Sequence, residues 1–394
     1  MAEAESLNLM EPLLPQESKC GELNDMALDL VAKSEKLSGQ INPVLQKSLG
    51  DLVRSMNCYY SNFIEGHNTL PRDIDRALKN NYDADPKKRN LQLESRAHIE
   101  VQQMIDAGAW VGEVVSDDFI KWVHKEFCAR LPEEMLWLEN PNTKEKIRII
   151  PGAYRDGEVE VGRHVPVLAE SVDRFMKRFA EAYNVKRIGR LKSIIGVAAS
   201  HHRLLWIHPF YDGNGRVTRL FSHALLQSLG IGNSLWSVSR GLARQKDRYK
   251  GLLMQSDLPR RNDLDGRGTL SEEALIEFCR FFLEICIDQV EYMASLLEPK
   301  ELLNRMSIYI EEEIRAERLH KGSMPLLKEA LIFGEFERGR ASEITGYQSR
   351  QASSVLSQLV SAGLLVSDTP RGAVRLGFPI DVIERWFPKL YPQV

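Results

Sequence analysis

One stretch of the sequence places a proton acceptor, a carboxylate, a glycine-rich turn and two guanidinium groups within twelve residues, from His208 to Arg219. The ordinary pKa of histidine lies close to neutrality, which makes His208 the natural general base. Asp212, four residues later, supplies the kind of carboxylate that holds Mg²⁺ together with phosphate oxygens. This combination of groups is typical of phosphate chemistry.

The neighbouring residues indicate how these groups are presented. Residues 191–207 predict a mostly buried helix, which ends because Pro209 lacks an N–H and disfavours helical geometry at the residue before it. Gly213 and Gly215 permit close backbone approach, and apolar residues then recur at helical spacing over 217–226. The turn therefore leads into a helix N-terminus, where free amides and the helix dipole favour an anion.

Arg216 and Arg219 are three residues apart and share one face of this second helix. Two guanidinium groups beside an anion-binding turn suit a polyphosphate better than a single carboxylate. Taken singly, each of these residues also fits a helix–loop–helix corner with a capping aspartate. The complete string favours the phosphate site.

The run His-Pro-Phe-Tyr-Asp-Gly-Asn-Gly-Arg-Val-Thr-Arg resembles the Fic family signature HPFx[D/E]GNGRxxR at every specified position. The resemblance covers about residues 40–295 and implies a mostly α Fic fold with transfer from a nucleotide, most often of AMP from ATP to a protein hydroxyl. By this resemblance His208 is the base toward a Ser, Thr or Tyr hydroxyl, and Asp212 is the Mg²⁺ ligand. The anion hole would be formed by Gly213, Asn214 and Gly215. The stretch that clamps the outer phosphates would be Arg216, Val217, Thr218 and Arg219. Pyrophosphate would leave.

A second string, from Ser61 to Asn68, lies at the end of a helical pattern. Ser61 and Glu65 are four residues apart, so they project from one helix face, and Gly66 is well placed to end the helix. The string resembles the Fic inhibitory motif [S/T]xxxE[G/N]. By that resemblance Glu65 would pair with Arg219 and hold ATP in a non-productive pose, so that we expect an autoinhibited enzyme.

A third element lies between residues 148 and 166. Its alternating residues around Asp156-Gly157 predict a β-hairpin in an otherwise helical chain. The Fic resemblance implies that this hairpin is the flap that aligns the target segment by strand-like pairing. The flap residues expected to border ATP and target are Val159, Glu160, Val161 and Gly162. A weaker resemblance, which departs from the paired tyrosines and asparagine of many relatives, assigns contacts with the adenine to Tyr249, Lys250 and Asp257.

Composition limits the class of protein. The net charge of −3 does not favour bulk nucleic-acid binding. The five cysteines are scattered without a CxxC pair, which excludes a disulfide scaffold and a cysteine zinc site. No stretch approaches the ~20 apolar residues of a membrane span, and the N-terminus lacks the pattern of a signal peptide. We therefore expect a cytoplasmic protein without membrane contact. Its oligomeric state stays open, and a homodimer is one possibility.

The chain is expected to contain five parts. They are a flexible tail over 1–25, a helical region with the inhibitory helix over 26–110, the Fic core over 111–298, a connecting helix over 299–323 and a winged-helix domain over 324–394. In the last part, residues 340–347 and 349–362 resemble a helix-turn-helix, and residues 363–376 read as a two-stranded wing. Polar side chains of its third helix could contact DNA, but Arg350 is the only cation of that helix, and phosphate affinity depends on such charges. DNA binding and a role in protein interaction or packing therefore both stay open.

Three functions are therefore open at this point. The first is an autoinhibited, Mg²⁺- and ATP-dependent protein adenylyltransferase. The second is another Fic-type transfer of a nucleotide or phosphoryl group, or removal of AMP from a modified target. The third is a DNA-binding regulator that uses the Fic core as a nucleotide sensor.

Overall fold

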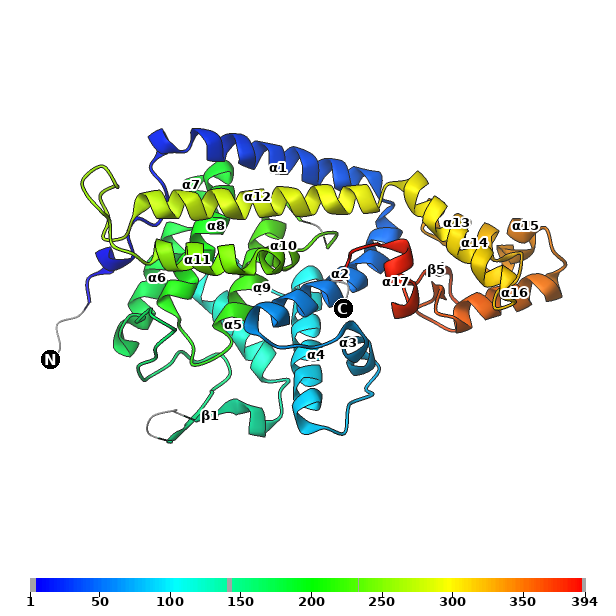
Figure 1. Cartoon of the computed structure of the whole chain (residues 1–394), viewed down its shortest axis with the longest axis horizontal. Coiled ribbons are helices and arrows are strands. Elements are labelled where there is room, and N and C mark those ends of the chain that lie inside the picture. The colour runs from blue at the N-terminus through cyan, green and yellow to red at the C-terminus, as the bar shows by residue number, and fades with distance from the viewer. Residues whose placement is uncertain (1–4, 140–143, 233, 392–394) are drawn as a thin grey trace. The chain divides into compact units, whose positions relative to one another are not determined.

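A computed structural model describes residues 5–139, 144–232 and 234–391 and is mostly helical (Figure 1). Contacts divide the chain into two compact units. The first contains residues 1–34, 57–233 and 237–289, and the second contains residues 35–56, 234–236 and 290–394. These boundaries cut across the five parts expected from the sequence, since helix α2 (Pro43–Glu65) contributes residues to both units.

The other helices that contribute to the first unit are α1 (Gly21–Gln40), α3 (Pro71–Leu78), α4 (Pro86–Asp106), α5 (Asp117–Cys128), α6 (Val172–Ala182), α7 (Val185–Ile188), α8 (Arg190–Ile207), α9 (Asn214–Ser228), α10 (Val238–Arg244), α11 (Lys246–Ser256) and most of α12 (Glu272–Leu296). Its strands are β1 (Trp137–Glu139) and β2 (Lys146–Arg148). The second unit contains α13 (Pro299–Arg315), α14 (Ser323–Phe333), α15 (Ala341–Thr345), α16 (Ser349–Ser361), α17 (Ile380–Trp386), β3 (Glu335–Phe336), β4 (Leu365–Val366) and β5 (Val374–Leu376).

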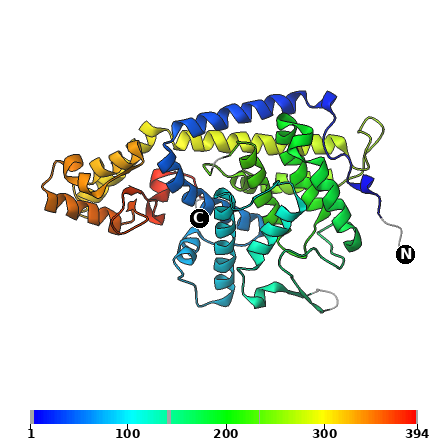
Figure 2. The ribbon, with the colours of Figure 1, turned by 180° about the vertical axis from the view of Figure 1, so that it is seen from behind.

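Helix α8 lies at the centre of the first unit and is buried along nearly its whole length. It packs against α6, α7 and α9, and α9 in turn packs against α4 and α5 (Figures 1 and 2). A helix buried all round must bond its polar side chains internally. His201 of α8 contacts the hydroxyls of Ser222 and Tyr249 at 2.8 and 2.7 Å, and Arg203 donates to the carbonyl of Pro12 at 2.8 Å. These contacts fix the register of the elements around α8.

The N-terminal segment differs from the flexible tail that the sequence predicts. Residues 7–10 and 17–19 form 3-10 turns, and Met10 and Leu13 are buried. The buried Tyr183 hydroxyl donates to the carbonyl of Leu13 at 2.6 Å. Residues 5–25 are ordered because they satisfy buried donors of the core, which composition does not reveal.

The predicted hairpin around Asp156-Gly157 is wrong. The antiparallel hairpin is formed earlier, by β1 and β2, with Leu138 opposite Ile147. The segment that follows is an irregular loop with one isolated bridge between Val161 and His164. The start of the loop bonds to the residues after α8, where the Arg155 N–H donates to the carbonyl of Pro209 at 2.9 Å.

The end of the second unit contains a three-stranded antiparallel sheet in the order β3-β5-β4, together with α14, α15 and α16. Helix α16 buries Ala352, Val355, Leu356 and Leu359. The connecting helix α13 ends at Arg315, earlier than expected. Membership of the winged-helix class, with its DNA or protein partner, stays a prediction. Among the described residues, no helix combines the length and apolar character needed to cross a membrane.

Candidate functional site

His208 lies directly after α8, in the left-handed backbone conformation (φ 50°, ψ 63°). This conformation and Pro209 end the helix at His208. Burial lowers the pKa of His208 to about 4; the Leu205 backbone opposes this shift, while Arg155 and His164 add to it. The imidazole is therefore neutral near pH 7, the state that a general base requires.

The loop after His208 is closed by its own side chains. The Asn214 side chain accepts from the Phe210 N–H at 3.0 Å and donates to the Phe210 carbonyl at 2.8 Å. The ring of His124 stacks on that of Phe210, with centroids 3.9 Å apart. Gly213 is in the left-handed conformation (φ 78°) and precedes α9. Asn214 therefore contributes to an anion site through its backbone, because its side chain is used to hold the loop.

The first turn of α9 presents amides that have no earlier helical carbonyl to bond, which is the usual basis of an anion site. Asp212 is exposed at the mouth of this turn. The described residues contain no group of three or more His, Cys, Asp or Glu side chains that could hold a metal. A single exposed carboxylate beside a phosphate site fits Mg²⁺, which keeps waters and phosphate oxygens in its shell. Val217 and Thr218 are buried in α9, so their side chains face the core.

Arg219 is the most completely bonded residue of the run, with partners in α2 and a contact with the Tyr249 hydroxyl of α11. Its Nε donates to the Ser61 hydroxyl at 2.9 Å, and a terminal nitrogen donates to the Ser61 carbonyl at 3.2 Å and to the Glu65 carboxylate. The Arg219 side chain is 2% exposed and that of Glu65 is 34% exposed. Burial opposes ionisation of Glu65, but Arg219, Arg216 and His67 outweigh it and hold its pKa below its usual range. The structure thus brings Glu65 and Ser61 to Arg219, as the resemblance implies.

Helix α2 is also held beside this contact by polar bonds of its last turns. Asn62 donates to the Ser95 hydroxyl of α4 at 2.9 Å. Lys246 of α11 donates to the Phe63 carbonyl at 2.8 Å, near the C-terminal end of α2. Polar contacts between α2 and its neighbours therefore surround the Glu65–Arg219 pair.

Arg216 has a partner that sequence reasoning missed. One of its terminal nitrogens lies 2.9 Å from the Glu94 carboxylate of α4 and 3.1 Å from Nδ1 of His67. The guanidinium also lies over the Phe127 ring, 5.2 Å from its centroid. Its side chain is only 6% exposed, and its Nε is buried without a hydrogen-bond partner among the described residues. Nothing in the spacing of the sequence pairs Glu94 with a residue 122 positions later.

The four predicted flap residues lie in the irregular loop. Val159 is half-buried, whereas Glu160, Val161 and Gly162 are exposed. The loop is tied to the catalytic run at two places. The Tyr211 hydroxyl donates to Asp156 at 2.7 Å, and Arg155 donates to the His208 carbonyl at 2.9 Å.

The three residues predicted to contact adenine have different surroundings. Tyr249 is buried, and its hydroxyl meets His201 at 2.7 Å, so it supports the core. Lys250 is exposed on α11. Asp257 lies 3.0 Å from Nε2 of the buried His202, with its side chain 22% exposed. The buried Tyr249 is thus held by α8, and its contact with adenine stays a prediction.

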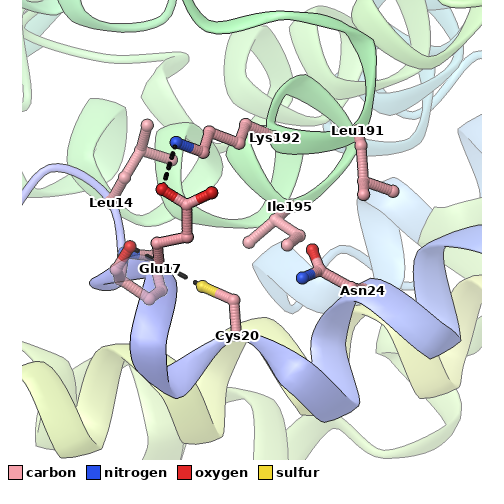
Figure 3. A pocket seen from close by; sticks show the side chains of 8 residues that line it. Leu14, Glu17, Cys20, Asn24, Leu191, Lys192 and Ile195 are labelled. Carbon is pink, nitrogen blue, oxygen red and sulfur yellow. Dashed lines mark hydrogen bonds and ion pairs between the residues drawn. The ribbon is translucent and has the colours of Figure 1, made fainter.

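A separate cavity of about 140 Å³ lies between the N-terminal segment and the start of α8 (Figure 3). Lys192 pairs with Glu17 at 3.2 Å across it (Figure 3). The Cys20 thiol contacts the Gln16 carbonyl at 3.2 Å. Burial raises the pKa of the Cys20 thiol, which makes it a poor nucleophile. The cavity contains none of the residues of the 208–219 run.

The part of the chain that contains residues 208–219 is similar to a known family. Residues 115–226 match the Fic/DOC family. The protein adenylyltransferase Fic of Nematostella vectensis is 32% identical over 181 residues, which cover 44% of this chain and 37% of that protein. The protein adenylyltransferase Fic of Drosophila erecta is 38% identical over 79 residues, which cover 20% of this chain and 16% of that protein. The chain thus spans well under half the length of these curated relatives.

A solved structure agrees in fold. Fic-1 (residues 134–508) from C. elegans aligns with a TM-score of 0.50 at 14% sequence identity. The alignment covers 70% of this chain and 72% of that one. At this identity the match supports the helical fold alone.

Proposed function

This chain carries a Fic/DOC-family domain over residues 115–226, and from that premise we propose that it is an autoinhibited protein adenylyltransferase. The observation that carries the proposal is the contact of Glu65 with Arg219, beside a neutral histidine at an open helix N-terminus. In the active form the enzyme transfers AMP from ATP to a hydroxyl of a target protein and releases pyrophosphate.

His208 acts as the general base in this proposal. The target hydroxyl oxygen bonds to the α-phosphorus, and its proton passes to the free imidazole nitrogen of His208. The bond from the α-phosphorus to the bridging oxygen breaks, and pyrophosphate leaves with the electron pair. The Leu205 backbone contacts the imidazole and raises its pKa, as an acceptor for one ring N–H does, so that the other nitrogen is left to take the proton.

The phosphates are placed at the first turn of α9, where the amides after Gly213 favour negative charge. Asp212 would hold Mg²⁺ there, and the ion would neutralise charge on the phosphate oxygens. The exposed loop residues Val161 and Val165, 40% and 72% exposed, are the surface offered to the target protein. Catalysis then depends mainly on positioning and charge, because little covalent chemistry is asked of the chain itself.

Glu65 is the inhibitory element in this proposal. Its carboxylate occupies the guanidinium of Arg219 and puts negative charge where an outer phosphate would bind. A phosphate must displace Glu65 before Arg219 becomes available. Release of the end of α2 would therefore free Arg219 for a phosphate, so that ATP binds in the productive pose and the enzyme becomes active.

The proposal is tested with ATP labelled at the α-phosphate or the γ-phosphate. The parent protein, Glu65→Gly and Glu65→Gly/His208→Ala are each incubated with a cell lysate and Mg²⁺. We expect protein labelling from the α position only, strongest in Glu65→Gly and lost with His208→Ala. Label from the γ position would assign a phosphoryl transfer instead, and α-labelling that survives His208→Ala would refute the assigned base.

A further inference from the structure

Arg155 is a buried cation that the proposed mechanism does not use. Its side chain is 0% exposed, and its nearest carboxylate, that of Glu158, lies 3.6 Å away with a side chain that is 59% exposed. The guanidinium instead donates to three backbone carbonyls, those of His208 at 2.9 Å, Gly157 at 3.1 Å and Val167. This buried guanidinium donates to carbonyls at both ends of one loop and to the carbonyl of His208. Because burial of a charge is costly, such an arrangement calls for a functional explanation.

The backbone that Arg155 bonds is the one that aims the base. His208 has φ 50°, a conformation that costs a non-glycine residue roughly 1–2 kcal/mol and persists only when its surroundings enforce it. The carbonyl of His208 is fixed by Nε of Arg155, and the carbonyl of Pro209 is fixed by the Arg155 N–H at 2.9 Å. Arg155 therefore bonds both peptide groups that follow the imidazole.

The same guanidinium ties the loop to this turn. Its bonds to Gly157 and Val167 span the segment that contains Val159 to Gly162. The exposed part of that segment and the base are thus positioned by one side chain. If the loop shifts, the imidazole shifts with it.

We propose that Arg155 is a positioning residue, which holds the imidazole of His208 in its reactive orientation and fixes the target-binding loop relative to it. This inference deepens the proposed function and rests on it. It assigns Arg155 a role in kcat, because its hydrogen bonds go to the backbone of His208, Pro209 and the loop and not to the first turn of α9. A misplacement of about 1 Å in such a geometry costs about 100-fold in rate.

The electrostatic surroundings of His208 give a second, independent readout. After burial and the opposing Leu205 backbone, the charged groups that act on its pKa are Arg155 and His164, which lower it, and Glu65, which raises it. Loss of the Arg155 charge removes one of the two lowering groups. The pKa of His208 should therefore rise when Arg155 is replaced by a neutral residue.

The kinetic test uses Arg155→Ala, Arg155→Lys and a control, Arg148→Ala, all on the Glu65→Gly background. Arg148 is an arginine of the same region whose side chain is 54% exposed and pairs with Glu133 on the surface. We expect kcat to fall about 100-fold in Arg155→Ala, with little change in KM for ATP. Lysine should restore only part of the loss, because it cannot reproduce the fork of donors. Added guanidinium at millimolar concentration should restore activity to Arg155→Ala but not change the control.

The second measurement does not depend on activity. An NMR titration follows the His208 imidazole in the parent and in Arg155→Ala, with assignment by His208→Gln. A higher pKa in the variant supports the proposal. The proposal would be overturned if both the pKa of His208 and kcat were unchanged. It would also be overturned if kcat fell together with thermal stability and guanidinium did not restore it. If Glu65→Gly transfers no AMP at all, the proposed function fails, and the titration alone still decides the role of Arg155.

Discussion

A Cβ atom added to Gly215 would lie 2.2 Å from Oε1 of Glu65 and 3.1 Å from a terminal nitrogen of Arg219. The absence of a side chain at Gly215 therefore leaves room for the Glu65 carboxylate of α2. An alanine has no difficulty with the helical backbone at this position, so any cost must come from the contact with Glu65.

We predict that Gly215→Ala lowers the free energy of unfolding by about 1–3 kcal/mol when Glu65 is present. In the Glu65→Gly background most of this loss should disappear, because the colliding side chain is gone. A double-mutant cycle measured by urea unfolding gives the coupling between the two positions. Equal losses in both backgrounds would show that Glu65 does not dock against Gly215 in solution.

Asp212 is expected to set the Mg²⁺ dependence of the reaction. In the Glu65→Gly background, Asp212→Asn should lower AMP transfer at physiological Mg²⁺ and require a higher Mg²⁺ concentration for half-maximal rate, because the amide is a weaker ligand than the carboxylate. Asp156→Asn is the matched control, since this nearby exposed carboxylate bonds Tyr211 and not the α9 turn. The same Mg²⁺ curve for both variants would remove Asp212 from the metal site.

The buried His98 makes stability depend on pH. Burial, together with the positive charges of Arg219 and Arg216 and with His223, lowers its pKa from an ordinary 6.5 to about 3. Above pH 6.5 the His98 imidazole is neutral in both the folded and the unfolded chain. Below pH 6.5 the unfolded chain binds a proton at His98 and the folded protein does not. The free energy of unfolding therefore falls as the pH drops toward 3.

We predict that His98→Leu is nearly neutral at pH 7, because neither ring nitrogen of His98 has a hydrogen-bond partner among the described residues. At pH 5 the variant should be more stable than the parent by about 2 kcal/mol, since 1.5 pH units at about 1.4 kcal/mol each separate the two proteins. Urea unfolding at both pH values measures the difference. An identical difference at pH 7 and pH 5 would contradict the account.

Glu94 is expected to stabilise the fold through Arg216. Glu94→Ala leaves a guanidinium with a 6% exposed side chain without its carboxylate and should lower the free energy of unfolding by about 3 kcal/mol. Glu94→Gln should cost less, because the amide oxygen still accepts a hydrogen bond. The control is Glu100→Ala on the same helix, whose 34% exposed side chain pairs with Arg96 and Arg130, with an expected loss of at most about 1 kcal/mol. Similar losses for Glu94→Ala and Glu100→Ala would refute the role given to the buried pair.

The core helices and the anion-binding turn were predictable because their signals are local. Apolar periodicity, Pro209 and the two glycines define α8, the turn and α9 within a few residues of the observed bounds. The contact of Glu65 with Arg219, 154 residues apart, is not local and came only from the family resemblance.

The errors have one physical origin, which is tertiary bonding that overrides local preference. Asp156-Gly157 has the chemistry of a hairpin turn, but the bonds of Arg155 to His208 and Val167 hold that segment as a loop. The alternation in Trp137-Leu138-Glu139 and Lys146-Ile147-Arg148 was the signal for the actual hairpin. The contact of Tyr249 with His201, 48 residues earlier, is another tertiary bond that nothing local in the sequence reveals.

The central claim is that Glu65 restrains the enzyme by occupying Arg219. The most direct test compares initial rates of AMP transfer from α-labelled ATP by the parent, Glu65→Gln and Glu65→Gly. A charged hydrogen bond contributes about 1.5–3 kcal/mol, so its loss should raise the rate roughly 10- to 100-fold in Glu65→Gly. Glu65→Gln, which keeps an acceptor but not the charge, should lie between the two. Equal rates for the parent and Glu65→Gly would contradict the account.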